Sequence, residues 1–150
     1  SPRRLQILQE HGLSAVVMPA NIEEIQQKNE EAKGYVTRLA REKAQAILSQ
    51  VETGSADLIL AADTTVAYQN HILEKPRDHE DAYRMLCMLS GGSHEVYTGY
   101  ALVFLPEQKW WIDCVTTHIT FTSKCVVEIS LFFSIIYALC SRFLQKQSIT

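Results

Sequence analysis

Asp63 is the side chain whose setting points most directly to chemistry. It follows the strand-like run 57–62 and precedes Thr64 and Thr65 rather than further apolar residues. If the run is a buried strand of an open α/β sheet, Asp63 lies outside its carboxyl end, where such sheets bind ligands. A carboxylate there can hold a metal ion or polarise a water molecule. It can equally cap a turn by accepting backbone N–H bonds, and position alone leaves both interpretations open.

Two lysines have constrained settings. Lys43 falls within the apolar stripe that Val36 and Leu39 begin, so its ammonium points toward the interior of the fold, where an anion could meet it. The alternative is that its stem packs while its charge escapes to water, which is the commoner outcome for a lone lysine. Lys75 precedes Pro76, which fixes the backbone beside it and limits where its side chain can point.

The first residues and a polar connection add further charged groups. Ser1, Arg3 and Arg4 supply a hydroxyl and guanidinium groups at a predicted helix N-terminus, where unpaired N–H groups favour phosphate. Taken alone, such an arginine pair is more often a solvated surface feature. Glu23 and Glu24 add carboxylates on a predicted loop. Together these positions hold the side chains that metal-assisted phosphate chemistry requires.

Composition excludes several other classes of function. The 150 residues carry 14 basic and 17 acidic side chains, a net charge of -3, so we expect no nucleic-acid or membrane partner. The apolar run 129–140 is shorter than the roughly 20 residues that a membrane-spanning helix needs. Four cysteines without a Cys-x-x-Cys pair, and no secretory or transit signal, predict free thiols in a cytoplasmic protein. Scattered histidines and the absence of Gly-x-Ser-x-Gly and Walker motifs leave metal-histidine, serine-hydrolase and P-loop sites unsupported.

The helices and strands that must position these residues are predicted from the spacing of apolar residues and from the turn and capping residues at the ends of each segment. Helices are predicted from Ser1 to Gly12, over 30–51 and over 78–89. Strands are predicted at 15–18, 57–62 with a continuation at 64–68, 94–105 and 110–121, the last two joined by a hairpin at 106–109. This order favours an α/β fold with a central mixed, twisted β-sheet flanked by helices.

Several motifs in this order resemble those of the Maf family of nucleotide pyrophosphatases over residues 1 to about 121. They are Ser-Pro-Arg-Arg at the start, Arg-Glu-Lys-Ala at 41–44, Ala-Asp-Thr-Thr-Val at 62–66, Leu-Glu-Lys-Pro at 73–76, Met-Leu-Ser-Gly at 88–91 and His-Glu-Val-Tyr-Thr-Gly at 94–99. The resemblance implies a Maf/ITPase-like fold. It also implies a hydrolase that acts on phosphoric anhydrides, cleaving a nucleoside triphosphate to the monophosphate and pyrophosphate.

The resemblance also assigns roles to individual residues. Asp63 matches the proposed general base, and with Glu24 it would lie at a divalent cation, Mg²⁺ or alternatively Mn²⁺. The triphosphate-binding set would be Ser1, Arg3, Arg4, Lys43 and Lys75, with Thr64 helping to set base preference. The Ala-Asp-Thr form resembles the branch acting on dTTP and UTP, with modified nucleotides as further candidates. A homodimer is the expected assembly.

The chain departs from the family pattern at both ends. Ser1 begins inside the first motif, so the strand that should precede it is absent and a sheet edge is expected to be open. We therefore expect a Maf-like domain over 1–121 and a divergent apolar segment over 122–150 that lacks the family's acidic helix and glutamine-bearing segment. Two alternatives remain: a catalytically inactive Maf-like isoform or fragment, and an aspartyl-phosphate phosphatase with Asp63 as nucleophile. Thr65 stands where the latter usually carry a second aspartate.

Overall fold

A computed structural model describes residues 1–52 and 54–123 of the chain. Its helices are α1 (Pro2–Glu10), α2 (Ala32–Leu48) and α3 (His79–Leu89), and its strands are β1 (Leu58–Tyr68), β2 (His71–Leu73), β3 (Ser93–Phe104) and β4 (Lys109–Thr120). The predicted helices are confirmed, as are the strands predicted over 57–68, 94–105 and 110–121, which correspond to β1, β3 and β4. The predicted segment 122–150 lies outside the described residues from 124 on.

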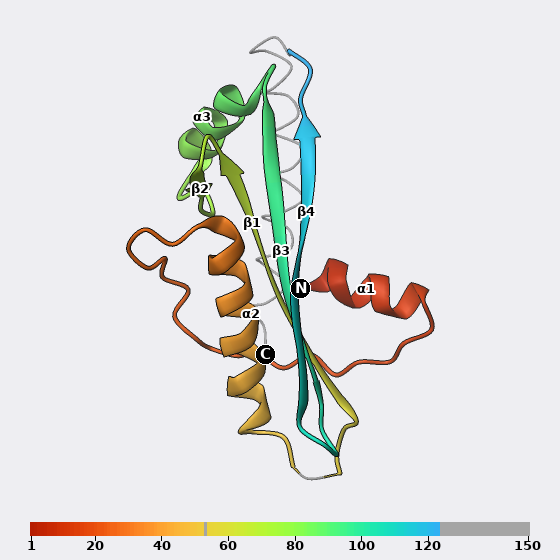
Figure 1. The fold of residues 1–150 in the computed structure, drawn as a ribbon. Helices are drawn as coiled ribbons and strands as arrows, with labels where there is room; N and C mark the ends of the chain where they lie inside the picture. Colours follow the sequence, from red (N-terminus) through yellow and green to blue (C-terminus); the bar gives the residue numbers. More distant parts are fainter. Residues whose placement is uncertain (53, 124–150) are drawn as a thin grey trace.

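The described strands form one sheet in the order β2-β1-β3-β4 (Figure 1). Figure 1 shows α2 on one side of this sheet and α1 on the other, which confirms an α/β fold with flanking helices. Every described pairing is antiparallel, so the prediction of a mixed sheet is wrong for this part of the chain. Connectivity accounts for two of these pairings, because tight turns join β1 to β2 and β3 to β4, whereas a parallel pair needs a longer crossover.

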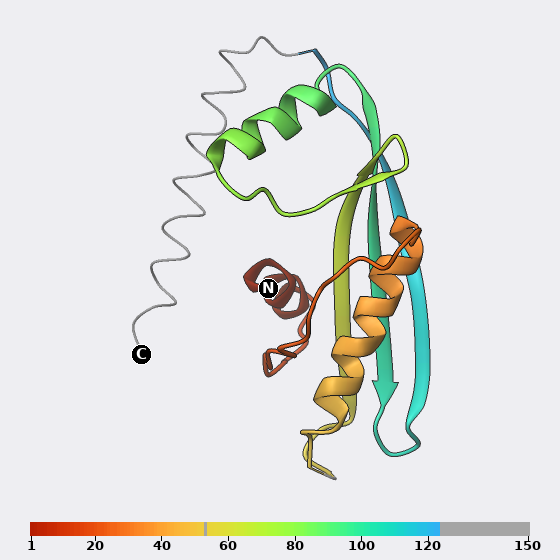
Figure 2. The same cartoon turned by 90° about the vertical axis from the view of Figure 1, so that its left-hand side faces the viewer.

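The predicted strand at 15–18 does not form. Residues 13–27 contain no helix or strand, and Val16 is 90% exposed. The short apolar run therefore has no buried face to occupy, and tertiary context overrides its β-propensity. Instead, this connection passes from α1 on one side of the sheet to α2 on the other (Figure 2).

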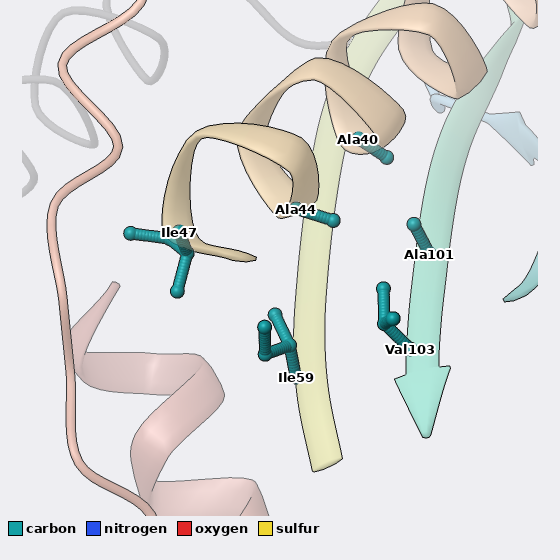
Figure 3. Close-up of a cluster of buried hydrophobic side chains, with 6 residues drawn as sticks. All are labelled: Ala40, Ala44, Ile47, Ile59, Ala101 and Val103. Carbon is teal, nitrogen blue, oxygen red and sulfur yellow. The ribbon is translucent and has the colours of Figure 1, made fainter. Parts of the chain in front are cut away.

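Helix α2 covers the sheet through a stripe of small and branched side chains. Ala40, Ala44 and Ile47 from α2 meet Ile59 of β1 and partners from β3 (Figure 3). The residues of β3 in this cluster, Ala101 and Val103, are fully buried. Because alanines face each other across much of this contact, the helix lies close to the strands.

Gly99 sets the closest approach of α2 to the sheet. A Cβ at this position would overlap the backbone carbonyl of Val36 and lie 2.7 Å from the backbone nitrogen of Thr37. Gly99 is also the β3 partner of Asp63 on β1. Because Gly99 has no side chain, α2 can pack closely against the sheet beside Asp63.

None of the helices in the described part of the chain combines the length and the apolarity needed to cross a membrane.

We expect Gly99→Ala to lower the free energy of unfolding by about 1–3 kcal/mol, since the added methyl group meets backbone rather than a movable side chain. Urea denaturation measures the change. Gly34→Ala on the exposed side of α2 is the matched control, because its new methyl group would make only an ordinary 3.8 Å contact with Glu30. That control should raise stability by about 0.5–1 kcal/mol, as alanine is the better helix former. Equal stability for Gly99→Ala and wild type would contradict the close approach.

Candidate active site

The centre of the site is an ammonium held between two carboxylates. Nζ of Lys43 lies 2.6 Å from Oδ1 of Asp63 and 2.7 Å from Oε1 of Glu24. The side chains of Lys43 and Asp63 are 18% and 12% exposed, whereas Glu24 is 37% exposed and reaches solvent. The charge of Lys43 therefore does not escape to water, and the prediction that it meets an anion in the interior is confirmed.

Asp63 lies in the middle of β1, and the prediction that it ends the strand is wrong. The strand continues through Thr64 and Thr65 to Tyr68 in antiparallel register with β3. Alternation of side chains places Asp63 on the face that carries Ile59, the face covered by α2. The opposite face of β1 stays open, since Leu58 and Leu60 are 44% and 48% exposed. The rule for strand ends applies to parallel sheets, and here the carboxylate is buried by the helix above it.

The charges of this cluster stabilise one another. Burial opposes the charge of Lys43, but hydrogen bonds to Asp63 and Glu24 outweigh it and raise the pKa of Lys43. The pKa of Glu24 is lowered, chiefly by the hydrogen bond from Lys43. The Glu24 contribution to stability is present above its usual pKa of 4.5 and is lost as pH falls through the lowered value. The Lys43 contribution is present below 10.5 and is lost only as pH rises through the raised value.

Lys75 extends the cluster toward solvent. Its Nζ lies 3.5 Å from Oε2 of Glu24, and its side chain is 92% exposed. Such a pair contributes little to stability, so its charge is available to a ligand.

The loop that follows Lys75 is fixed by the start of α3. Asp81 accepts a hydrogen bond from the backbone nitrogen of Arg77 at 3.2 Å and one from the Arg84 side chain at 2.6 Å. These contacts, led by that of Arg84, lower the pKa of Asp81 to about 2. Asp78 caps the helix by accepting from the backbone nitrogen of Asp81. Sequence reasoning missed Asp81, although its place in the first turn after a capping Asp78 was a usable signal.

Helix α1 brings the first motif to β1. Arg4 donates to the carbonyl of Ala62 and to Oγ1 of Thr64, both at 2.8 Å. Thr64 in turn lies 3.0 Å from the hydroxyl of Thr98 on β3. Ser1 is the N-cap residue of α1 and Arg3 is exposed in its first turn. Of the predicted residues, Lys43 joins Asp63 to Glu24, and Lys75 lies beside Glu24. Arg4 instead contacts Thr64, which projects from the opposite face of β1.

Glu24 and Asp63 could bind one divalent cation together only if other ligands completed its coordination. Among the described residues, no three or more His, Cys, Asp or Glu side chains form a metal-binding group. Glu24 and Asp63 nevertheless converge on one positive charge, the ammonium of Lys43. Mg²⁺ is commonly held by one or two carboxylates together with water and substrate phosphates. The pair therefore fits a cation that arrives with a phosphorylated substrate.

Comparison with known proteins gives a family match and several similar relatives. A family model described as Maf-like protein matches residues 1–132. The dTTP/UTP pyrophosphatase of Anaeromyxobacter sp. (strain Fw109-5) is 41% identical over 133 residues, which cover 87% of this chain and 62% of the relative. The dTTP/UTP pyrophosphatase of Agathobacter rectalis is 46% identical over 117 residues, covering 71% and 57%. That of Escherichia coli O6:K15:H31 is 45% identical over 123 residues, covering 81% and 59%. The chain thus spans 57% to 62% of the length of these relatives.

Lys43→Met should lower the free energy of unfolding by about 1–3 kcal/mol at pH 7, because it leaves the largely buried Asp63 carboxylate facing Glu24 without a counter-charge. The deficit should narrow as pH falls below 4.5, the usual pKa of glutamate, since protonation relieves the repulsion. Chemical denaturation from pH 7 down to acid measures both effects. Lys33→Met, at an exposed position of the same helix, should change stability little at any of these pH values. A deficit that is constant with pH would show that Lys43 stabilises by packing alone.

Proposed function

The chain belongs to the Maf family, and we propose that it is a nucleoside-triphosphate pyrophosphatase that hydrolyses dTTP and UTP to the monophosphate and pyrophosphate. The observation that carries this proposal is the contact of Lys43 with both Asp63 and Glu24. Arg4 lies at the residues on either side of Asp63. A cation for phosphate and two carboxylates for a metal ion and a water molecule therefore meet on the α2 face of β1, and Arg4 reaches the same stretch of this strand through Ala62 and Thr64. The name shared by the relatives supports dTTP and UTP as substrates.

In this proposal the cationic side chains bind the triphosphate. The ammonium of Lys43 has three N–H donors, of which two suffice for Asp63 and Glu24, so one remains for a phosphate oxygen. Lys75 and Arg3 add exposed charges that can move to meet the ligand. Arg4 holds the start of α1 beside Thr64, where base preference would be set.

Asp63 is the proposed general base. Its carboxylate is fixed by Lys43 and shielded by α2, so it can orient an attacking water molecule and take its proton. Glu24 and Asp63 would hold Mg²⁺ or Mn²⁺, and the ion when bound supplies neutralisation of charge on the phosphate oxygens. The remaining catalysis is positioning by the arginine and lysine side chains.

Pyrophosphate release from dTTP, UTP, CTP and methylated GTP, with Mg²⁺ and with chelator, tests the proposal directly. Metal-dependent release from dTTP or UTP by this 150-residue chain is the expected result. No release from a folded sample would favour the catalytically inactive Maf-like alternative. Trapping of a phosphoenzyme on Asp63 would favour the phosphatase alternative instead.

Asp63→Asn should abolish pyrophosphate release while preserving the fold, because the amide keeps the size of the carboxylate but cannot accept a proton at neutral pH. We expect a loss of about 100-fold or more in kcat, the range typical of a general base. Asp57→Asn, at an exposed residue just before β1, is the matched control and should keep wild-type turnover. Unchanged turnover in Asp63→Asn would remove this residue from the mechanism.

Lys75→Ala should weaken triphosphate binding more than monophosphate binding, because its exposed charge lies at the outer rim of the cluster. Losing one charged hydrogen bond costs about 1.5–3 kcal/mol, which is roughly 10- to 150-fold in affinity. Binding of non-hydrolysable dTTP and of dTMP can be compared by calorimetry, with exposed Lys109→Ala as the control. Equal losses for both ligands would count against a role in gripping the outer phosphates.

A further inference from the structure

The loop that carries Glu24 has no secondary structure of its own. Residues 21–30, called the acidic loop below, contain neither helix nor strand. Glu24 nevertheless places its carboxylate within 2.7 Å of Lys43. Since a loop without a ladder of hydrogen bonds needs other partners for its backbone, something outside the loop must hold it in place.

Tyr35 supplies the first of these partners. Its hydroxyl donates to the backbone carbonyl of Glu24 at 3.1 Å, and the residue is only 6% exposed. The ring packs in a cluster with Val36 and Leu39, against which Ile22 of the acidic loop also lies. The hydroxyl is therefore held firmly by the core of the protein and acts on the backbone of Glu24 itself.

Arg38 supplies the second. Its Nε and Nη2 atoms lie 2.7 Å and 2.8 Å from the two carboxylate oxygens of Glu30, a two-point contact of fixed geometry. The same Nη2 atom donates to the carbonyl of Ile25 at 2.9 Å, next to Glu24. Nη1 is held from the helix side by Glu42 at 3.1 Å. One guanidinium thus ties two points of the acidic loop to α2.

Tyr35 lies on the side of α2 that also carries Lys43, because Tyr35, Leu39 and Lys43 are spaced four residues apart. Arg38 is three residues from Tyr35 and lies on the neighbouring side of the helix. The helix that presents the ammonium therefore also holds the loop that brings Glu24 to it. The guanidinium carbon of Arg38 lies 5.7 Å from the centre of the Tyr35 ring, so the two anchors also support each other.

We propose that Arg38 and Tyr35 are positioning residues that clamp the acidic loop to α2 and thereby hold Glu24 at the site where a divalent cation binds. Neither side chain needs to touch Asp63 in this role. Tyr35 acts on the backbone of Glu24, and Arg38 acts on the carboxylate of Glu30 and the backbone of Ile25. The consequence for catalysis rests on the pyrophosphatase function proposed above. Groups that orient a metal-binding carboxylate typically change metal affinity or activity by about 10- to 100-fold when they are removed.

The clamp is tested with Arg38→Lys, which keeps the charge but loses the two-point contact, and with Tyr35→Phe, which removes only the hydroxyl. The Mg²⁺ concentration that half-saturates pyrophosphate release should rise about tenfold in Arg38→Lys, with kcat recovering at saturating Mg²⁺. Glu42→Gln is the matched control, because it removes the negative charge of the helix-side partner of Arg38 and leaves the contacts of Arg38 with the loop. It should leave the Mg²⁺ dependence unchanged. Glu30→Gln should shift the Mg²⁺ dependence in the same direction as Arg38→Lys, and the double variant should show less than the sum of the two effects, since both weaken the contact between Arg38 and Glu30.

A second measurement does not depend on activity. Hydrogen exchange of the acidic-loop amides, measured without Mg²⁺, should be faster in Arg38→Lys and Tyr35→Phe, with β1 and β3 unchanged. If wild type releases pyrophosphate but Mg²⁺ dependence is unaltered in Arg38→Lys, the clamp is refuted and the proposed function stands. If wild type releases no pyrophosphate, the proposed function fails and hydrogen exchange alone tests the clamp. Faster exchange of the acidic-loop amides in the variants would then support the clamp, and unaltered exchange would overturn it.

Discussion

The close approach of α2 to the sheet is the constraint on which the other features depend. Gly99 leaves no room for a side chain beneath the helix, and the facing alanines of α2 and β3 keep the two layers near each other. Lys43 can therefore reach Asp63 directly, and Tyr35 and Arg38 can reach the loop that passes beside the helix. If α2 lay farther from the strands, Lys43 would not reach Asp63.

The charges at this contact form a balanced group rather than an isolated pair. Lys43 and Lys75 meet Glu24, and Lys43 also meets the largely buried Asp63. Burying charges costs free energy, and pairing them within hydrogen-bond distance is what makes the arrangement tolerable. A hydrophobic contact of similar volume could stabilise the fold equally well. The presence of charged side chains here is therefore in keeping with the function proposed for them.

Attachment of α1 has a different physical basis from that of α2. No residue of α1 is buried, and the helix is joined to β1 through the side chain of Arg4. Helices without fully buried side chains belong to the less stable parts of a protein. The first motif is thus placed against Thr64 by the same kind of group that would bind phosphate, whereas α2 is fixed by its buried stripe.

The sequence by itself determined the helices, the long strands β1, β3 and β4, the family, and the charged side chains whose positions pointed to a function. Periodicity, capping residues and ordered motifs are local, so they can be identified without a structure. It did not determine that β1 runs on past Asp63, because a short apolar run does not show whether one or both of its faces are covered. Nor did it reveal the anchoring of the acidic loop by Tyr35 and Arg38, although both lie in the best-predicted helix. Only the tertiary structure decided that Lys43 meets Asp63 and Glu24, because those contacts depend on how near three distant segments of the chain are brought by the packing at Gly99.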